Sequence, residues 1–521
     1  MSVFVYSGAQ MKQADCYAIE VCGIDSKQLM DTAACGIVRE TERRVPLAEK
    51  TCVLVCGKGN NGGDGFAAAL HFCVHCAEVK TVCLWEEESL SEDARYYRGK
   101  TVAAGVECIT DLQTALKAIA DADLVVDALY GFGFRGELSD MDAELCRAMN
   151  ASRAYVVSAD IPSGVGANDA NVAQDSVCAD LTVTFTGYKL SAILFDSALY
   201  YGEIAVADIG LPAEAKNGVK PIAHVVDANT ALDSLGIRRR NMHKGDFSKV
   251  FVLGGSRGMS GAVYMSAQAA LKSGAGLVVA GVPDCISDIM EIKTTEVMTL
   301  ALNEENGGLR YDAAAICQAQ AYDALAFGMG AGRASGIREF LRKIIAEVQK
   351  PILIDADGLY ALSEDMDMLK GHTQTIALTP HSGEMARLCK KTTEEIEADR
   401  IGAAKMLAQA YNVYVVLKGA HTVIASPNGE VAISCLVGNS GMATAGSGDV
   451  LSGIGALMLA RNTDAFSAMQ AAVYIHAFAG DLAAQEKGED GMCAGDMLEA
   501  LPYAIQKIRE NENQFGRRCI Q

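Results

Sequence analysis

The sequence GNSGMATAGSGD occupies residues 438–449 and runs directly into the apolar, helix-compatible segment VLSG at 450–453. Glycines let a backbone approach a ligand closely, and the free N–H groups at the start of a helix bind anions. Asp449 would repel a phosphate resting in such a loop. A useful role for its carboxylate is therefore to accept the proton of a hydroxyl group that is being phosphorylated. The alternative is a glycine-rich turn in which Asp449 only caps the helix, because short glycine motifs recur by chance.

The composition describes a globular α/β chain. Of its 521 residues half are apolar, Gly is abundant and Pro is scarce. At about 150 residues per domain, this length predicts two to four domains. The net charge of −20 argues against a surface that binds nucleic acid or anionic lipid, because contacts to phosphate need Lys and Arg. Anionic ligands would then be held locally, by backbone amides and a few cations.

Several features predict a cytoplasmic protein without a membrane segment. The opening residues MSVFVY lack a basic segment followed by an apolar run, and no stretch of about 18 apolar residues occurs. Seventeen cysteines in a chain of this length suit reduced thiols better than a disulfide framework. The cluster HFCVHC at 71–76 favours structural cysteines on a helix over a zinc site, because no second ligand pair follows at zinc spacing.

The N-terminal half predicts a strand, a glycine loop and a helix in that order. Apolar spacing indicates helices at 8–22 and 26–44 ahead of any strand, the first ended by Gly23 and the second capped by Ser26. A buried strand at 51–56 then feeds the loop GKGNNGGDG, and a helix follows from about 66 to 76. This arrangement binds dinucleotides or phosphates. The loop is not GxGxxG, and its Asn and Asp side chains favour polar recognition of a ligand or of a hard cation.

Two later strands of this half end in acidic residues. We expect strands at 78–85, 122–128 and 154–160, with helices near 91–104, 111–120 and 139–150. Asp127 and Asp160 close the segments VVD and SAD, and the carboxyl ends of parallel strands form the ligand edge of such a sheet. Each Asp alone could cap a turn. Three polar strand ends in one domain favour a binding site.

The motifs GNNGGDG, VDALYGFG and ADIPSG, with the opening GAQMKQADCYAIEVCGI, resemble the N-terminal domain of the bifunctional NAD(P)H-hydrate repair enzymes. The resemblance covers about residues 8–216. It implies a Rossmann-like, three-layer epimerase domain that interconverts the R and S forms of NAD(P)H hydrated at C6 of the nicotinamide ring, and a bound K⁺ ion. The residues that resemble substrate contacts are Asn60, Asn61, Gly62, Gly63, Asp64, Gly131, Phe132, Gly133, Phe134, Arg135, Gly136, Glu137 and Asp160. Those that resemble K⁺ ligands, all oxygen donors, are Asn61, Asp127 and Ser163.

A second α/β series follows a break in the pattern at 216–240, which contains Pro221 and the run Arg238-Arg239-Arg240. Its predicted strands are at 249–253, 277–282, 322–327, 351–355, 375–379 and 413–417, with a helix ending at Gly274. His381 and Lys418 alone would be an ordinary loop histidine and a surface lysine. Because both follow buried strands, we expect them to converge with Asp449 on one edge of the sheet.

This second half resembles the ribokinase-like, ADP- or ATP-dependent NAD(P)H-hydrate dehydratase domain. The matching motifs, spread over about 243–482, are HKGDF, VLGGSRGMSGA, DADGL, LTPHSGEMARL, VVLKGAHT, GMATAGSGDVLSG and HAFAGDLAA. The residues that resemble hydrate contacts are Ala262, Gly332, His381 and Asp449. Those that resemble nucleotide contacts are Lys418, Gly419, Ala420, His421, Thr422 and Gly448. The expected domains are thus an epimerase at 1–216, a junction at 217–240 and a dehydratase at 241–521.

The implied chemistry gives the acidic residues separate roles. Phosphorylation of the C6 hydroxyl by a nucleotide with Mg²⁺ would make a good leaving group, Asp449 would accept the hydroxyl proton, and the ring nitrogen would expel phosphate. Epimerisation needs an acid or base close to C6, for which Asp160 is the leading candidate, with Asp127 occupied by the cation.

Two other classes stay open. One is a ribokinase-type small-molecule kinase fused to a non-catalytic Rossmann-like domain, which shares the GSGD loop but leaves GNNGGDG with DIPSG unexplained. The other is an N-terminal scaffold without activity. The expected partners are hydrated NADH and NADPH with ADP or ATP, ADP being the donor expected for a bacterial fusion. The sequence sets neither a preference between NADH and NADPH nor whether the chain forms a homo-oligomer.

Overall fold

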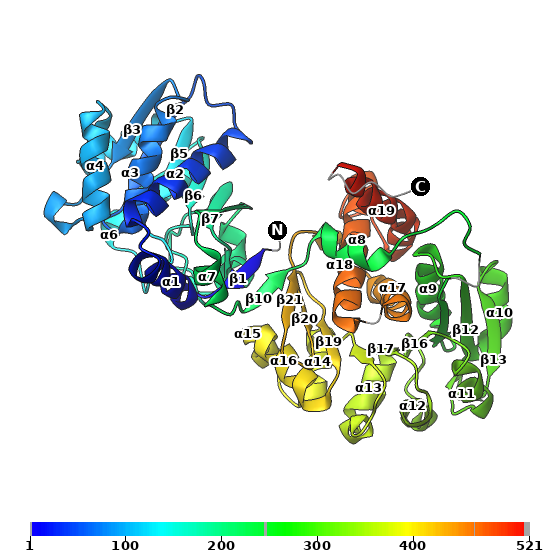
Figure 1. The fold of residues 1–521 in the computed structure, drawn as a ribbon. Coiled ribbons are helices and arrows are strands. Elements are labelled where there is room, and N and C mark those ends of the chain that lie inside the picture. Colours follow the sequence, from blue (N-terminus) through cyan, green and yellow to red (C-terminus); the bar gives the residue numbers. More distant parts are fainter. Residues whose placement is uncertain (1–2, 244–246, 463, 515–521) are drawn as a thin grey trace. The chain divides into compact units, whose positions relative to one another are not determined.

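A computed structural model describes residues 3–243, 247–462 and 464–514 of the chain. It divides into two compact units, which meet in the sequence between His224 and Val225 and are drawn in Figure 1. Each unit is a layered α/β structure with its own sheet.

Unit 1 is built on a parallel sheet in the order β4-β3-β2-β5-β6-β7-β9. Its strands are β2 (Thr51–Cys56), β3 (Glu78–Val82), β4 (Glu107–Ile109), β5 (Leu124–Ala128), β6 (Tyr155–Ala159), β7 (Leu181–Phe185) and β9 (Glu203–Ala207). Its helices are α1 (Gly8–Cys16), α2 (Ser26–Glu42), α3 (Asn60–Phe72), α4 (Glu92–Ala103), α5 (Leu112–Asp121), α6 (Asp140–Ala151) and α7 (Ala213–Asn217).

Alternation along each strand builds two separate cores around this sheet. In β2, Leu54 packs into the core that contains α2, α3 and α4, whereas Val53 and Val55 pack into the core that contains α5 and α6. The result is the three-layer arrangement expected for a Rossmann-like domain. The chain leaves β2 toward β3 in one direction and returns to β5 in the other, so the loops after β2 and β5 flank the topological switch point, where α/β sheets bind ligands.

Three expectations for the N-terminal region are wrong. The N-cap of α2 is Asp25, whose carboxylate accepts a hydrogen bond from the Lys27 backbone N–H (3.0 Å), and not Ser26. A short strand, β1 (Phe4–Tyr6), precedes both helices and pairs with β10 (Ala223–Val225) and β8 (Tyr188–Lys189). Helix α3 begins at Asn60 rather than near residue 66, with Gly59 as its N-cap, so GNNGGDG is mostly helix. The glycines there serve close packing: a Cβ on Gly62 would lie 1.8 Å from the carbonyl oxygen of Gly57. The glycines of this stretch have low helix propensity, so the sequence predicted a loop here. The helix forms because tertiary packing outweighs intrinsic helix propensity.

Unit 2 has a larger sheet that is parallel from β13 to β19 and closes with the antiparallel strands β20 and β21. Its order is β13-β12-β11-β16-β17-β18-β19-β20-β21. The strands are β11 (Lys249–Leu253), β12 (Leu277–Pro283), β13 (Met298–Leu302), β16 (Ala324–Phe327), β17 (Ile352–Ile354), β18 (Ile376–Leu378), β19 (Tyr414–Leu417), β20 (Thr422–Ala425) and β21 (Val431–Ser434), with the hairpin β14 (Glu304–Glu305) and β15 (Gly308–Leu309).

The helices of unit 2 form layers against this sheet (Figure 1). They are α8 (Ala228–Leu235), α9 (Ser260–Lys272), α10 (Ser287–Lys293), α11 (Ala313–Ala319), α12 (Ser335–Glu347), α13 (Asp357–Ser363), α14 (Ser382–Cys389), α15 (Thr393–Ala398), α16 (Arg400–Tyr411), α17 (Ser447–Arg461), α18 (Ala465–Lys487) and α19 (Ala494–Gln514). Helices α17 and α18 are apolar around most of their circumference because α8, α9, α19 and the sheet enclose them in one core.

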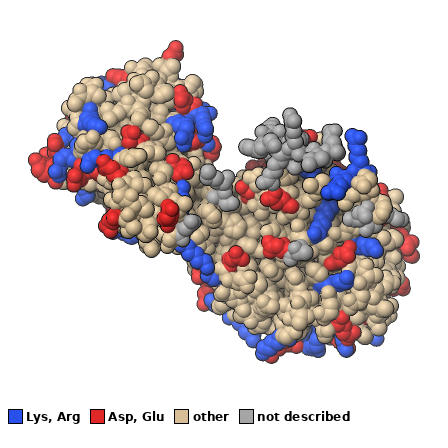
Figure 2. Space-filling view, viewed as in Figure 1, with Lys and Arg blue, Asp and Glu red and all other residues tan. Residues whose placement is uncertain are grey.

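The stretch at 217–240 contains ordered elements. It includes β10 and helix α8, whose N-cap Asp227 accepts a hydrogen bond from the backbone N–H of Thr230 and whose Ala231 and Leu235 are buried. Lys244, Gly245 and Asp246 of the HKGDF motif lie outside the described residues. Across the face of each unit seen in Figure 2, basic and acidic side chains are interspersed. Among the described residues, no helix is both long and apolar enough to cross a membrane.

Candidate active sites

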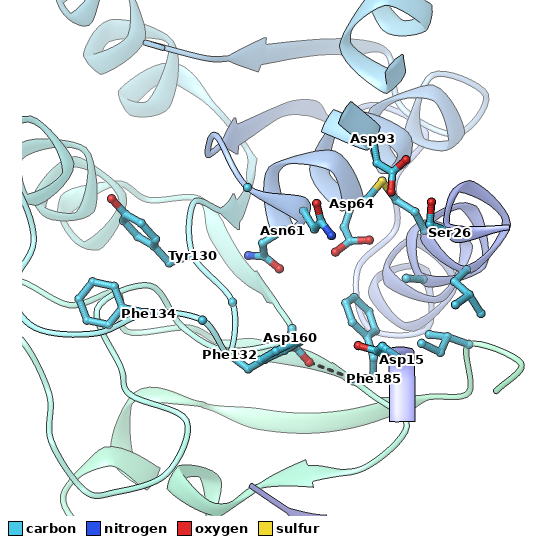
Figure 3. A pocket seen from close by; sticks show the side chains of 18 of the residues that line it. Asp15, Ser26, Asn61, Asp64, Asp93, Tyr130, Phe132, Phe134, Asp160 and Phe185 are labelled. Carbon is cyan, nitrogen blue, oxygen red and sulfur yellow. Dashed lines mark hydrogen bonds between the residues drawn. The ribbon is translucent and has the colours of Figure 1, made fainter. Parts of the chain in front are cut away.

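Unit 1 contains a cavity of about 400 Å³ where the loops after β2, β5 and β6 meet α1 and α2 (Figure 3). The predicted substrate residues that line it are Asn60, Asn61, Asp64, Gly131, Phe132, Gly133, Phe134 and Asp160. Gly62 and Gly63 lie behind its wall, packed on Gly57 and Met30, and Arg135, Gly136 and Glu137 continue the β5 loop beyond it. The cavity therefore combines aromatic walls with convergent carboxyl and amide groups, as expected of a small-molecule site.

Two of the three predicted cation ligands, Asp127 and Ser163, belong to one polar cluster. The fully buried carboxylate of Asp127 accepts hydrogen bonds from the Ser158 hydroxyl (2.8 Å), the Ser163 hydroxyl (2.5 Å) and the Ser163 backbone N–H (2.8 Å). Burial raises the pKa of Asp127, and the bonds from Ser163 oppose that shift. The Ser163 hydroxyl oxygen in turn accepts from the Tyr130 backbone N–H (3.0 Å).

Asn61 is the third predicted ligand, and its amide is incompletely paired. Its Nδ2 atom is buried with no hydrogen-bond partner among the described residues. A Cβ on Gly131 would lie 3.1 Å from the Asn61 Oδ1 atom, so the amide lies directly against the β5 loop. Turning the amide over would place its oxygen at this unpaired position. Oxygen donors with an unsatisfied amide fit a hard monovalent cation such as K⁺.

Asp160 is held in a buried ion pair that the sequence did not suggest. Lys189 of β8, whose side chain is 1% exposed, donates hydrogen bonds to Asp160, to the Thr184 hydroxyl (3.0 Å) and to the Phe185 carbonyl (3.0 Å). Asp160 also has a φ of +67°, a conformation that few non-glycine residues adopt. The carboxylate is thus fixed at the cavity edge. Protonating it would leave the Lys189 ammonium buried without a counter-ion.

Two other carboxyl groups of this cavity are strongly perturbed. Burial, followed by the charges of Asp160 and Asp15, raises the pKa of Asp64 well above its ordinary value. Burial raises the pKa of Asp15 to about 6, which the Lys189 charge opposes. Asp15 and Lys189 were missed by the sequence reasoning. No local pattern marks a helix acid as facing a cavity formed by distant loops, or a strand lysine as the partner of an acid 29 residues earlier in the chain.

The second candidate site lies at the carboxyl edge of the unit 2 sheet. The parallel strands β11, β16, β17, β18 and β19 all end there, and α17 begins there after Gly446, whose φ is +93°. Asp449 stands in the first turn of α17, where backbone N–H groups lack partners within the helix. Burial, and then the charge of Asp355, raise the pKa of Asp449 to about 7, while Lys418 opposes the shift. The carboxylate is therefore an effective proton acceptor near neutral pH.

Lys418 connects this helix start to the strands. Its ammonium is 2.8 Å from the Asp355 carboxylate and 3.8 Å from that of Glu384, and a Cβ on Gly448 would lie 3.3 Å from it. The Ser452 hydroxyl donates to the other oxygen of Asp355 (2.6 Å). Lys418 thus lies beside the glycine loop, as the sequence predicted. Asp355 belongs to the sequence motif DADGL, but only the structure shows that it is the partner of Lys418 and Ser452.

The other nucleotide candidates form the turn between β19 and β20. The guanidinium of Arg400 donates to the carbonyl oxygens of Leu417 and Lys418 (3.1 and 3.0 Å), and the Thr422 hydroxyl donates to the Gly419 carbonyl (3.0 Å). Ala420 is exposed and His421 is partly exposed. Arg400 and Thr422 thus fix one side of the turn, and Ala420 and, in part, His421 are exposed to solvent on its other side.

The remaining hydrate candidates come from three different strand ends. Ala262 lies in the first turn of α9, with its Cβ 2.9 Å from where a Cβ on Gly330 would be. Gly332 has a φ of +85° and donates its backbone N–H to Asp357 (3.0 Å). His381 is the N-cap of α14 and its side chain is 60% exposed. Ala262, Gly332 and His381 thus follow β11, β16 and β18 respectively, at the edge where Asp449 lies.

Comparison with known proteins agrees with this two-part architecture. A family model described as "NAD(P)H-hydrate dehydratase" matches residues 250–503, and one described as "YjeF-related protein N-terminus" matches residues 26–191. The bifunctional NAD(P)H-hydrate repair enzyme Nnr of Moorella thermoacetica is 38% identical, and the match covers 98% of each chain. The Nnr protein of Thermofilum pendens is 34% identical over 96% of each chain.

A solved structure is also similar to part of the chain. The ADP/ATP-dependent NAD(P)H-hydrate dehydratase from Bacillus subtilis, co-crystallized with ATP and Mg²⁺, is 25% identical, with a TM-score of 0.47. The match covers 55% of this chain and 98% of that chain.

The fold and the two sites define a two-domain enzyme with a Rossmann-like part and a ribokinase-like part. The chain belongs to the family of bifunctional NAD(P)H-hydrate repair enzymes. The resemblance drawn from the sequence motifs is confirmed, and so is the predicted fold class.

Proposed function

We propose that the chain repairs hydrated NADH and NADPH in two steps. Unit 1 interconverts the R and S hydrates, and unit 2 dehydrates the S hydrate with a nucleotide, which we take to be ADP yielding AMP and phosphate. The observation that carries the proposal is Asp449, a carboxyl with a pKa near 7 beside the helix start and Lys418. A phosphate-binding loop needs no such acid unless a hydroxyl group loses its proton there.

The residues of unit 2 divide the dehydration among them. Asp449 accepts the proton of the C6 hydroxyl as phosphate is transferred to that oxygen, and the N–H groups of Gly446 to Gly448 stabilise the transferring group. Lys418, paired with Asp355, neutralises nucleotide charge. Mg²⁺, when bound with the nucleotide, would shield its phosphates. The ring nitrogen lone pair then expels phosphate, C5 loses a proton as the C5=C6 double bond forms, and NAD(P)H is restored. Because Asp449 and the helix start are fixed on one side of C6, we expect the S hydrate alone to react.

In unit 1, the aromatic side chains Phe132 and Phe134 provide a surface for the nicotinamide ring, and Asn60, Asn61 and Asp64 bind its polar groups. Asn61, Asp127 and Ser163 would hold K⁺, which would supply positive charge beside the dinucleotide phosphates. Asp160, fixed by Lys189, orients the substrate.

The overall proposal is tested by supplying an equal mixture of hydrates with ADP and Mg²⁺ and following the absorbance of reduced nicotinamide. Full conversion is expected. A kinase that phosphorylates an unrelated alcohol and leaves the hydrates untouched would support the ribokinase-type alternative instead.

The cation prediction has its own test. We expect R–S exchange to be faster with K⁺ than with a bulky organic cation, and Asp127→Ala to weaken both ion and substrate binding, because the oxygen donors suit a hard cation. The measurement is the exchange rate by chiral chromatography in each salt. Equal rates in both salts would show that the ion site is wrong.

A further inference from the structure

The carboxyl groups of the unit 1 cavity differ in their hydrogen-bond and ion-pair partners. This difference distinguishes groups that can transfer a proton from one that is held in place. Asp15 comes from α1, Asp64 from α3 and Asp160 from the end of β6, and the three side chains point toward a common space (Figure 3). We propose that Asp64 and Asp15 are the acid–base pair of the epimerase and that Asp160 is a positioning residue. This inference rests on the proposed epimerase function.

Asp160 differs from the other two carboxyl groups because several donors hold it in place. Lys189 is itself enclosed and has the Asp160 carboxylate, a hydroxyl and a carbonyl oxygen as partners. Asp160 also accepts from the Phe185 backbone N–H (3.3 Å) and the Thr184 hydroxyl (3.3 Å). These donors hold the carboxylate in one orientation, which suits a positioning role.

Asp15 has the opposite character. Its Oδ1 atom is buried and has no hydrogen-bond partner among the described residues, although the side chain lines the cavity. An unsatisfied buried polar atom is costly, and one that belongs to a cavity-lining side chain indicates that a bound group completes its bonding. The hydrated ring, with a hydroxyl at C6, offers such a donor.

Asp64 projects into the same cavity from the first turns of α3. The charged groups around it are Asp15 on α1, Asp93 on α4, Asp160 after β6 and Lys189 on β8. Three carboxyl groups and one ammonium, which is already paired with Asp160, favour the protonated form of Asp64. Asp64 is therefore placed to give a proton, whereas Asp15, whose pKa burial raises to about 6, has an unpaired oxygen that can accept one. Environments that separate two carboxyl groups in this way mark acid–base assignments in known enzymes.

The pair accounts for inversion at C6 with all atoms balanced. Asp64 gives its proton to the C6 hydroxyl, the C6–O bond breaks, water leaves, and the ring nitrogen lone pair forms an N1=C6 double bond with a positive charge on nitrogen. Water then adds to the other face of C6, its proton passes to Asp15, and the electron pair returns to nitrogen. Asp64 ends ionised and Asp15 protonated. The reverse epimerisation uses the two groups in exchanged roles, so one pair serves both epimers.

The experiment uses the full chain with Asp449→Asn as the parent, so that dehydration does not consume the S hydrate. Chiral chromatography follows R–S exchange, and mass spectrometry follows uptake of solvent ¹⁸O at C6. Asp64→Asn and Asp15→Asn should each lower kcat by about 10²–10⁴-fold, as for general acids and bases, with KM changed less than threefold. Asp15→Glu should recover part of the rate, and each inversion should introduce one solvent oxygen.

Two further variants serve as controls. Glu92→Gln removes one negative charge from a site outside the cavity, where the side chain is 90% exposed, and should leave the rate unchanged. Asp160→Asn with Lys189→Met removes both partners of the ion pair and should raise KM while the pH profile of kcat keeps both limbs. For the parent we expect a bell-shaped pH profile of kcat. Its acid limb reports the ionisation of Asp15 and should be absent in Asp15→Asn.

The outcomes are distinct. If Asp64→Asn and Asp15→Asn fold and keep kcat within tenfold of the parent, the assignment is overturned, and the proposed function stands. If the parent itself does not exceed the uncatalysed exchange rate, the proposed function of unit 1 falls and the inference falls with it. Fluorescence of Trp85, the one tryptophan of the chain, checks folding of unit 1 in every variant.

Discussion

At the scale of single residues, the strongest functional prediction concerns Asp449 as the proton acceptor of dehydration. We expect Asp449→Asn to lower the turnover of dehydration by about 10²–10⁴-fold while nucleotide affinity changes little, because only the proton acceptor is removed. Steady-state rates on the S hydrate and nucleotide titration by calorimetry measure the two quantities. A variant with more than a tenth of the normal turnover would remove Asp449 from this role.

The pH dependence of dehydration follows from the same carboxyl. Asp449 must be ionised to accept a proton, and its pKa in the free protein is about 7. The value of kcat/KM should therefore be constant above about pH 8 and fall tenfold per pH unit well below 7. The nearby His476 cannot cause this limb, because burial lowers its pKa to about 4.

Asp355→Asn tests the origin of that limb. The Asp355 charge raises the pKa of Asp449, and its removal also frees the Lys418 ammonium to lower that pKa further. Both effects have the same sign, so the acid limb of the kcat/KM profile should move to lower pH. A limb that stays in place would mean that a group other than Asp449 sets it.

At the scale of elements, the start of α3 depends on close backbone approach. A Cβ on Gly62 would lie 1.8 Å from the Gly57 carbonyl oxygen, so Gly62→Ala must displace α3 from the loop after β2. We expect unit 1 to lose about 1–3 kcal/mol of stability, as for other overpacked sites, and to lose cavity geometry with it. Urea unfolding followed by Trp85 fluorescence measures the stability.

A matched control lies in the neighbouring helix. A Cβ on Gly99 of α4 would meet nothing within 4 Å, so Gly99→Ala should instead stabilise unit 1 by about 0.5–1 kcal/mol. If both substitutions had the same effect, the contact between α3 and the loop after β2 would not be what requires Gly62.

At the scale of the whole molecule, the two units should act as separate catalysts that share a diffusing intermediate. With Asp64→Asn in the full chain, about half of an equal R/S mixture should be converted rapidly, and the remainder at the uncatalysed epimerisation rate. The structure favours Asp64 over Asp160 for this variant, because Asp160→Ala would leave Lys189 buried and unpaired.

Complementation uses a second full-length variant. Asp449→Asn lacks dehydration and keeps the epimerase, so its addition to Asp64→Asn should restore full conversion. The time course of absorbance with ADP and Mg²⁺ present records both phases. A single-phase run to completion by Asp64→Asn alone would show either that Asp64 is dispensable or that unit 2 accepts both epimers, and chiral chromatography of the residual hydrate would separate these.

Much of the molecule could be predicted from the sequence because its signals are local. Short apolar runs predicted β2, β5, β6 and β11, since strands buried on both faces need continuous apolar residues. The motifs predicted two α/β domains, and glycines beside Asp449 predicted a helix start with an acid. In each case the cause lies within about ten residues of chain.

Other features were decided only by the tertiary structure. Strand β1 is three residues long and exists because distant strands pair with it, and α3 begins at Asn60 because Gly62 can press against Gly57. The ion pair of Asp160 with Lys189, and the buried, unpaired Oδ1 atom of Asp15, depend on which elements the sheet order brings together. Local sequence determines which chemical groups the chain offers. Burial and hydrogen-bond partners decide whether a carboxyl group acts as a proton acceptor or as a fixed counter-ion. Both depend on residues far away in the chain, so only the tertiary structure decides between these roles.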